Sequence, residues 1–300
     1  MKISIIGTSK ITDSHLRSIL KNKIKIISIS STREKSKRLK KLSKKFKIKK
    51  SFSKWTENIK YAKKNNSNFL ICGRIEDNFK VLKKCCETGK KILIEKPVFI
   101  DPKKFNTFLK YRKQIFVGYN RIFYKNIIFL KKELKNKNKL SCIVKCPESS
   151  RKAILTNSCH IISILYYLFG DLKLIKKIKL KKNISCLFQS EKKDVITINF
   201  SLKNSDNFSI EVFDENKRYH LAPIEKLSIF KNLETKNIFN NKVYLPKIFY
   251  QYDEIKMSKS FKPGFNKQIQ AFKKFERKKN IFNNILFAKK IMSICNKIIK

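Results

Sequence analysis

A lysine between an acid and a proline is the first feature of this 300-residue sequence whose chemistry is informative. Glu95-Lys96-Pro97 follows the short apolar run Ile92-Leu93-Ile94, and Gly89 stands before that run. Glycine is typical of a helix end, the apolar run of a buried parallel strand, and proline of a strand end. The pattern therefore places Lys96 at the carboxyl end of a strand, the edge of a parallel sheet where ligands bind. A lysine held there can orient an oxygen, donate a hydrogen bond or carry a proton.

His160 is the second candidate for proton transfer. It lies near the start of an apolar segment that runs from Leu155 to Gly170. Residues three and four apart share a helix face, so Thr156 and Ser163 are expected beside it. A histidine titrates near neutral pH and can take a proton from a hydroxyl group. The alternatives are Lys96 in a solvated surface turn and His160 as a core histidine bonded to a backbone carbonyl.

The elements that position Lys96 alternate between strand and helix. Apolar runs separated by helical stretches of about ten residues are typical of parallel βαβ units. Strands are expected at 2–6, 24–30, 69–72, 91–94 and 115–117, and helices at 12–21, 34–45, 55–64, 77–88 and 102–110. The pattern predicts a doubly wound Rossmann domain over residues 1–119.

The second half, which carries His160, has a different pattern. Strand-like runs follow one another with Asn, Asp and Ser turns between them, which favours an antiparallel sheet. They fall at 140–146, 184–189, 194–202, 208–213, 218–221 and 227–230, with helices at 157–169 and at the chain end. An apolar stripe is expected on the last helix, formed by Ile281, Ile285, Ala288, Met292, Cys295 and Ile299. The fold class is therefore α/β: a Rossmann sheet followed, over residues 120–300, by an α+β domain with an open, largely antiparallel sheet.

Two turns are candidates for binding a dinucleotide. The first strand is followed by Gly7-Thr8-Ser9-Lys10-Ile11-Thr12, where the fold usually has Gly-x-Gly-x-x-Gly or Ala. Only Gly7 is kept, although the hydroxyls of Ser9 and Thr12 can donate hydrogen bonds. Ser30-Ser31-Thr32-Arg33 follows the second strand, where an NAD enzyme usually has an acid. Because Arg33 suits a 2′-phosphate, we expect NADP in preference to NAD; the alternative is an exposed Arg33 at the start of the next helix.

These segments together resemble the glucose–fructose oxidoreductase / inositol dehydrogenase / rhizopine-catabolism (Gfo/Idh/MocA) family of nicotinamide-dependent sugar dehydrogenases. The resemblance rests on Gly89 to Pro97, Cys72 to Asn78, Val117 to Arg121 and Leu155 to Gly170. The chain departs from the family at Asn78, where histidine is usual, and at Thr156 and Ser163, where aspartate is usual. His15 matches a family histidine, and we assign it only a packing role.

The resemblance implies roles for particular residues. Lys96 and His160 are the expected catalytic pair, because His160 aligns with the family's catalytic histidine. Expected cofactor contacts are Gly7, Ser9, Lys10, Ile11, Ser31, Thr32, Arg33, Gly73, Arg74, Asn78, Glu95, Lys96 and Asn120. Expected substrate contacts are Lys96, Tyr119, Arg121, Thr156, Asn157 and His160. The alternatives are that Arg74 is solvated and that Arg121 braces the domain junction.

The expected function is that of an NAD(P)-dependent oxidoreductase acting on a CH–OH group of a sugar, sugar nucleotide or cyclic polyol. Similar members of the family are associated with surface-polysaccharide sugar synthesis, and a homo-oligomer through the C-terminal sheet is expected. The alternative is a noncatalytic relative that binds a dinucleotide or sugar and regulates a partner. The missing glycines and acids favour that alternative, whereas the presence of both Lys96 and His160 opposes it.

The composition includes 72 Lys and Arg against 22 Asp and Glu, a formal net charge of +50. Such a charge favours nucleic-acid binding. However, the lysines are spread through every segment, and the abundance of Lys, Asn, Ile and Phe together is what A+T-rich codons produce. We find no zinc-finger, basic-zipper or RNA-recognition motif, so only weak, nonspecific nucleic-acid binding is expected.

The cysteines and the apolar runs indicate the cellular compartment in which the protein is expected. None of the eight cysteines forms a Cys-x-x-Cys pair, and most have apolar neighbours. They are expected to be buried, reduced thiols of a cytoplasmic protein without a metal site. No apolar run is long enough for a membrane span, and the start of the chain is expected to be a strand and not a signal peptide.

Overall fold

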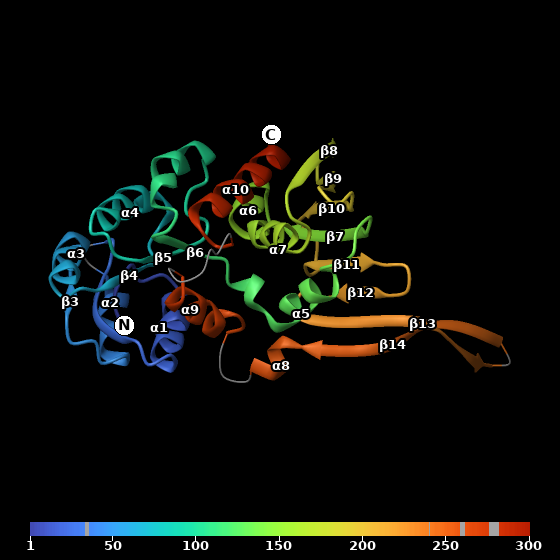
Figure 1. The fold of residues 1–300 in the computed structure, drawn as a ribbon, viewed down its shortest axis with the longest axis horizontal. Helices are drawn as coiled ribbons and strands as arrows, with labels where there is room; N and C mark the ends of the chain where they lie inside the picture. The colour runs from blue at the N-terminus through green and yellow to red at the C-terminus, as the bar shows by residue number, and fades with distance from the viewer. Residues whose placement is uncertain (34–35, 240, 259–261, 276–281) are drawn as a thin grey trace. The chain divides into compact units, whose positions relative to one another are not determined.

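The computed structural model describes residues 1–33, 36–239, 241–258, 262–275 and 282–300 (Figure 1). Glu34 of the predicted second helix and Ile281 of the predicted stripe lie outside the described residues. The chain divides into two compact units, Met1–Phe123 with Ser260–Asn296, and Tyr124–Lys259 with Lys297–Lys300. This division differs from the predicted boundary at 119/120, because helices α9 (Phe265–Lys273) and α10 (Ile285–Ile299) return to the first unit.

The first unit contains a six-stranded parallel sheet, which confirms the predicted Rossmann architecture. Its strand order is β3-β2-β1-β4-β5-β6. The strands are β1 (Lys2–Ile6), β2 (Lys25–Ser30), β3 (Ser51–Phe52), β4 (Asn68–Ile71), β5 (Ile92–Glu95) and β6 (Ile115–Gly118). The helices are α1 (Thr12–Lys21), α2 (Lys37–Lys45), α3 (Trp55–Lys64) and α4 (Asn78–Cys86), with 3-10 helices at Ile75–Asp77, Pro102–Tyr111 and Asn120–Phe123. Within this sheet, the short β3 was not predicted from the sequence pattern.

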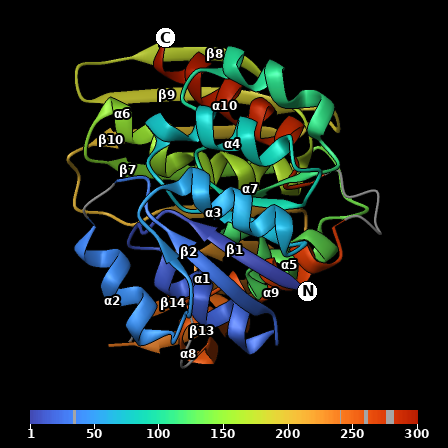
Figure 2. The same cartoon turned by 90° about the vertical axis from the view of Figure 1, so that its left-hand side faces the viewer.

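Helices cover both faces of this sheet (Figure 2). One core joins Ile19 of α1, Leu42 of α2 and Phe272 of α9 to strand residues such as Ile5. Phe272 also lies edge-on against Phe116 of β6, with ring centroids 5.9 Å apart. A parallel sheet covered on both faces needs apolar strands, which explains the short, continuously apolar runs in the sequence.

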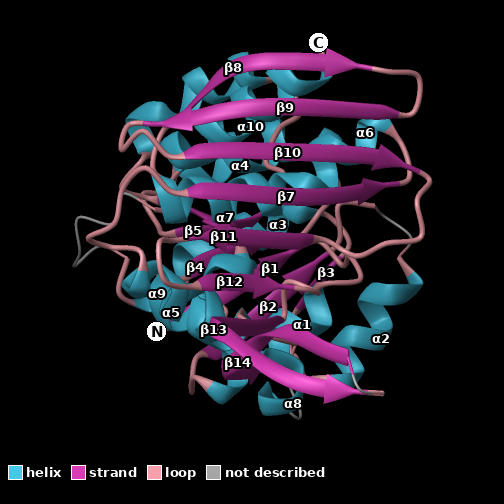
Figure 3. Cartoon of the chain, turned by 90° about the vertical axis from the view of Figure 1, so that its right-hand side faces the viewer, coloured by secondary structure: helices cyan, strands magenta, loops and turns pink. Residues whose placement is uncertain are grey.

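The second unit contains an eight-stranded sheet of order β14-β13-β12-β11-β7-β10-β9-β8 (Figure 3). Every neighbouring pair is antiparallel except β7 with β10, so the predicted largely antiparallel sheet is confirmed. The strands are β7 (Ser141–Glu148), β8 (Leu172–Lys179), β9 (Asn183–Ser190), β10 (Val195–Leu202), β11 (Ser209–Phe213), β12 (Arg218–Leu221), β13 (Lys226–Ile238) and β14 (Asn241–Asp253).

The helices of the second unit include α7, which carries His160. They are α5 (Lys125–Glu133), α6 (Arg151–Ala153), a π-helical turn (Ile154–Ser158), α7 (Cys159–Phe169) and α8 (Glu254–Ser258). Ten of the eleven residues of α7 are buried, which is why this helix is almost uniformly apolar.

The eight cysteines are all free and buried, as predicted. Burial raises the pKa of their thiols wherever a shift is resolved, to about 12 for Cys86 and about 11 for Cys186. In the ranges that the structure describes, no helix is long and apolar enough to cross a membrane.

Candidate active site

Gly7 forms the turn between β1 and α1, and its backbone conformation is one that side chains rarely allow. Its φ is +103°, and a Cβ there would lie 2.4 Å from the carbonyl carbon of Cys72 and the nitrogen of Gly73. The Gly7 N–H donates to the Ser30 carbonyl at 2.8 Å, and the Ser9 N–H donates to the Cys72 carbonyl at 3.3 Å. The turn is therefore fastened to the carboxyl ends of β2 and β4, and glycine is required at its first position.

The remainder of the turn fits a phosphate group, although two of the usual glycines are replaced. The hydroxyls of Ser9 and Thr12 lie 3.5 Å apart, and the Thr12 hydroxyl donates to the Gly7 carbonyl at 3.5 Å. Ile11 is the N-cap residue of α1, and no side chain caps this helix end. Backbone N–H groups at such an end bind anions well. Lys10 is exposed beside them.

The residues after β2 form a small turn close to β4. The Arg33 N–H donates to the Ser31 hydroxyl at 3.0 Å, while the Arg33 side chain is exposed. A Cβ on Gly73 would lie 3.1 Å from the methyl carbon of Thr32, so this glycine allows the two turns to approach. Gly7, Thr32 and Gly73 thus stand together at the carboxyl edge of the sheet, where a Rossmann fold binds its dinucleotide.

Glu95 and His15 form a buried pair directly before Lys96. The His15 Nε2 donates to the Glu95 Oε1 at 2.5 Å, and the His15 side chain is fully buried. The Glu95 Oε2 accepts the Lys96 N–H at 3.3 Å. A Cβ on Gly118 would lie 3.0 Å from the same carboxylate, so the neighbouring strand makes room for it. Glu95, expected to contact a cofactor, is directed to His15, and His15 has more than the packing role predicted for it.

Asn78 and Arg74 also have protein partners. The Asn78 amide donates to the Val98 carbonyl at 3.0 Å, which holds the loop that follows Lys96. The Arg74 guanidinium donates to both carboxylate oxygens of Asp77, at 3.1 and 3.3 Å, while remaining about half exposed. These contacts position the edge of the sheet, and the cofactor contacts expected of both residues remain predictions.

The stretch after β6 is mostly directed into the first unit. Tyr119 is completely buried, with its ring edge-on to Phe287 at 5.5 Å. The Asn120 amide donates to the Pro263 carbonyl at 3.2 Å. Arg121 is half-buried. Tyr119 has no accessible surface in this structure, and the substrate contact expected of it stays a prediction.

His160 lies in the first turn of α7 in the second unit, and it is 6 % exposed. The preceding residues, including Thr156, form a π-helical turn, which has a wider spacing than an α-helix. Thr156 and His160 are therefore not placed by the regular four-residue spacing that the sequence suggested. The Ser163 hydroxyl donates to the His160 carbonyl at 2.6 Å, so Ser163 fastens the backbone and does not replace a carboxylate beside the ring.

Glu148 at the end of β7 is a site residue that the sequence reasoning missed. Its carboxylate is 5 % exposed and accepts hydrogen bonds from the Ser158 hydroxyl and, at 3.3 Å, from the Asn157 amide. Asn157, expected to contact substrate, is thus tied to a strand. A sequence signal was present, since Glu148 is the only acid between Glu133 and Asp171.

The structure gathers the predicted residues into two groups. In the first unit, Gly7, Gly73 and Lys96 follow β1, β4 and β5, which are adjacent in the sheet. In the second, Thr156, Asn157 and His160 lie around the start of α7. Among the described residues, no cluster of His, Cys, Asp and Glu could hold a metal ion.

The first group defines a dinucleotide-binding Rossmann edge, and comparison with known families identifies its class. Residues 1–117 match the family described as an oxidoreductase family with an NAD-binding Rossmann fold. The predicted resemblance to the Gfo/Idh/MocA oxidoreductases is therefore confirmed over these residues. No curated protein matches the sequence closely enough to count as a relative.

Solved structures extend the likeness to the whole chain. UDP-N-acetylglucosamine 3-dehydrogenase from Acidithiobacillus ferrooxidans superposes with a TM-score of 0.75 at 11% identity, covering 99% of this chain and 96% of that one. A putative myo-inositol dehydrogenase from Sinorhizobium meliloti 1021 gives 0.70 at 12% identity, covering 99% and 95%. An oxidoreductase from Agrobacterium radiobacter, in complex with NAD+, L-tartaric acid and magnesium, gives 0.73 at 11% identity, covering 99% and 94%. At these identities the likeness shows the shared two-domain fold.

Proposed function

We propose that the chain is an NAD(P)-dependent oxidoreductase acting on a secondary alcohol of a sugar, a sugar nucleotide or a cyclic polyol. The observation that carries the proposal is the edge of the first sheet, where the Gly7 turn, Gly73 and Lys96 follow three adjacent parallel strands. The bound dinucleotide would supply the electron-pair chemistry, and the protein would supply orientation and proton handling. The solved dehydrogenases with the same fold support the substrate class, and a role in surface-polysaccharide sugar synthesis is its narrowest form.

The proposed protein chemistry needs one cation and one base at a single substrate oxygen. Lys96, at the carboxyl end of β5, would orient and polarise that oxygen. His160 would take the hydroxyl proton in oxidation and return it in reduction. Glu95 and Glu148 would hold the segments around the two groups, because the Glu95 carboxylate accepts the Lys96 N–H and the Glu148 carboxylate accepts from the Asn157 and Ser158 side chains.

Turnover measurements on single and double variants test the proposal. His160→Ala should lower turnover by about 10²–10⁴-fold and leave cofactor affinity nearly unchanged. Lys96→Ala should lower turnover as well. Because both groups act on one oxygen, the double variant should lose less than the product of the single losses. A panel of UDP-sugars, free sugars and inositols supplies candidate substrates. Wild-type turnover in both single variants would place the chemistry elsewhere, and cofactor binding without turnover on any substrate would favour the noncatalytic alternative.

We propose NADP as the preferred cofactor. The support is the turn after β2, where Ser31, Thr32 and the exposed Arg33 stand in place of the usual acid. A guanidinium can make a charge-assisted hydrogen bond to a 2′-phosphate, worth about 1.5–3 kcal/mol. Arg33→Ala should therefore reduce the preference for NADP over NAD by about tenfold or more, measured by fluorescence titration of NADPH and NADH. Equal affinities in the wild-type protein would contradict this part of the proposal.

We also propose a homo-oligomer formed through the second sheet. Among the described residues, the outer part of β13 is paired with β14 alone, for example Leu233 with Pro246 and Thr235 with Tyr244. The two strands expose large apolar side chains, including Leu233, Tyr244 and Phe249, each more than 60% accessible. A two-stranded ribbon with exposed apolar groups is marginal alone and gains stability from a partner. Phe249→Asp should shift the mass measured by light scattering toward that of the monomer. Lys247→Asp is the control and should leave the mass unchanged, because Lys247 is exposed and carries no large apolar side chain.

A further inference from the structure

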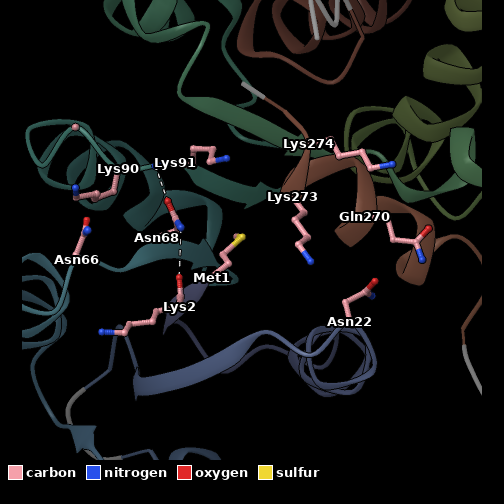
Figure 4. Close-up of a pocket in the computed structure, with 11 residues that line it drawn as sticks. Met1, Lys2, Asn22, Asn66, Asn68, Lys90, Lys91, Gln270, Lys273 and Lys274 are labelled. Carbon is pink, nitrogen blue, oxygen red and sulfur yellow. Dashed lines mark hydrogen bonds between the residues drawn. The ribbon is translucent and has the colours of Figure 1, made fainter. Parts of the chain in front are cut away.

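A pocket of about 880 Å³ lies in the first unit, and the reaction proposed above does not use it (Figure 4). Its described lining residues come from the ends of several elements that are distant in sequence. They are Met1, Lys2, Asn22, Asn66, Asn68, Gly89, Lys90, Lys91, Gln270, Lys273 and Lys274. A pocket of this size is large enough for a nucleotide-sized ligand.

The described lining of the pocket is rich in positive charge. Five of the eleven described lining residues are lysines and four carry carboxamides, while none is an acid. Lysine ammonium groups are compact point charges, and carboxamide N–H groups add neutral donors. In the part of the chain that the structure describes, Lys90, Lys273 and Lys274 form no ion pair with a carboxylate, whereas other surface lysines such as Lys84 do. The lining therefore favours an anion with many acceptor oxygens.

The pocket lies at the edge of the sheet opposite to the proposed cofactor turns. Lys2 and Asn68 begin β1 and β4, and Lys91 directly precedes β5. Gly7, Gly73 and Lys96 follow the other ends of the same three strands. Because the strands are parallel, the two sets of residues stand at opposite edges, so a ligand here would leave the dinucleotide turns open.

Part of the lining is fixed by hydrogen bonds before any ligand arrives. The Asn68 side chain accepts the Lys91 N–H at 3.1 Å and donates to the Lys2 carbonyl at 3.3 Å, which joins β1, β4 and β5 (Figure 4). The Asn22 amide donates to the Ser18 carbonyl at 2.8 Å and to the Asn266 side chain at 2.7 Å. Figure 4 shows the Lys273 side chain extending into the space between Met1 and Asn22. A fixed floor with long lysine side chains around it suits an elongated anion.

Several helices end at this edge of the sheet, and lysines lie at or near their ends. α1 and α3 end here, and the carboxyl ends of helices attract cations. The Lys2 ammonium does serve such an end, since it donates to the Asn65 carbonyl at 3.4 Å. Lys273 is the last residue of α9 and Lys274 its C-cap residue, and Lys90 follows the end of α4. These three are the lysines on which an added ligand would depend most.

We propose that this pocket binds a small polyphosphate anion, such as the phosphate chain of a nucleotide, independently of the proposed cofactor. The class follows from the described lining, which has several positive charges, additional amide donors and no acid, and from room for a nucleotide-sized ligand. A single carboxylate or sulfate would contact only one end of such a set. The proposal does not depend on the oxidoreductase reaction.

Calorimetric titration of the full chain with inorganic tripolyphosphate at about 0.15 M salt tests the site, because this ionic strength screens diffuse surface attraction. The pocket of the wild-type protein should bind one equivalent, apart from any equivalent taken by the Gly7 turn. The triple variant Lys90→Gln, Lys273→Gln, Lys274→Gln should bind about 10–100-fold more weakly, the sum expected for three partly exposed contacts.

The matched control removes three exposed lysines from α2, with Lys40→Gln, Lys41→Gln and Lys44→Gln. It should bind within about twofold of wild type, because the same net charge is lost from a helix that adds no residue to the described lining of the pocket. Equal weakening in both triple variants would show that net charge alone attracts the anion and would overturn the proposal. Absence of a one-to-one phase in the wild-type titration would overturn it too. Circular dichroism confirms that each variant is folded.

Discussion

The hydrogen bond between His15 and Glu95 can be tested with two substitutions that differ by one methylene group. The amide nitrogen of a glutamine side chain reaches about as far as the histidine Nε2, whereas that of asparagine reaches only about as far as Nδ1. His15→Gln should therefore keep a donor for the Glu95 carboxylate, and His15→Asn should lose it. Both variants lose the edge-on ring contact with Phe265, at 4.8 Å between centroids. Their difference in stability therefore reports the hydrogen bond together with the burial of one methylene group, which contributes about 0.8 kcal/mol.

The expected size of that difference follows from burial. The His15 side chain is fully buried and that of Glu95 is 16% exposed, so water replaces the lost donor poorly. A hydrogen bond to a charged group contributes about 1.5–3 kcal/mol net. His15→Asn should therefore be less stable than His15→Gln by about 2 kcal/mol, which is a difference of about 4–8 °C in Tm for a unit of this size.

The assay is urea unfolding followed by tryptophan fluorescence. The chain has a single tryptophan, Trp55 at the start of α3, so the signal reports on the first unit. If the oxidoreductase proposal holds, His15→Asn should also lower turnover more than His15→Gln, because the Glu95 carboxylate holds the Lys96 backbone. Stabilities of the two variants that agree within about 0.5 kcal/mol would refute the importance of this pair.

Three further predictions concern the framework around the site. Gly7→Ala should destabilise the first unit by at least about 3 kcal/mol, because the added Cβ would clash with backbone atoms. Gly89→Ala should destabilise it by only about 1 kcal/mol in the same unfolding assay, because Gly89 has a positive φ but open space around the added Cβ. Burial works to raise the pKa of Asp13, but hydrogen bonds from Lys45 and Arg17 outweigh this effect and lower the pKa. The ionised Asp13 should therefore stabilise the folded protein above about pH 4, and this contribution should be lost as the pH falls through the lowered pKa. Asp13→Asn should flatten that part of an acid-unfolding curve. Glu148→Ala should lower turnover more than Glu148→Gln, since the amide can still accept one hydrogen bond from the turn before α7, and equal losses would argue against this role.

The strong periodic patterns of the sequence were sufficient to predict most of the fold. The apolar runs of β1, β4, β5 and β6 are short and continuous because helices cover both faces of their sheet, and such runs between helical stretches are typical of parallel strands. β8 was missed because its sequence, LKLIKKIK, lies at a sheet edge where lysines replace the usual alternation. β14 was missed for a similar reason, since most of its residues are exposed and no buried face imposes a period of two.

The contacts of the candidate site were harder to predict, because they join residues with no fixed spacing. His15 and Glu95 are 80 positions apart and meet only after α1 and β5 have packed into the same unit. The π-helical turn before His160 is another example. Helical periodicity predicts which face a residue occupies only while the spacing stays regular, and the wide turn at Ile154–Ser158 breaks it.

The polar residues around Lys96 and His160 share a physical role that their residue types did not reveal. Glu95, Asn78 and Asn157 were all expected to contact a ligand, yet each hydrogen-bonds to another part of its own unit. A loop at the end of a strand has backbone and side-chain groups that must be satisfied before it can hold one conformation. A catalytic lysine or histidine is effective only if the segment that carries it holds the side chain in one position. These hydrogen bonds give the three residues a structural role beside the ligand contacts predicted for them, and the proposed chemistry depends on Lys96 and His160.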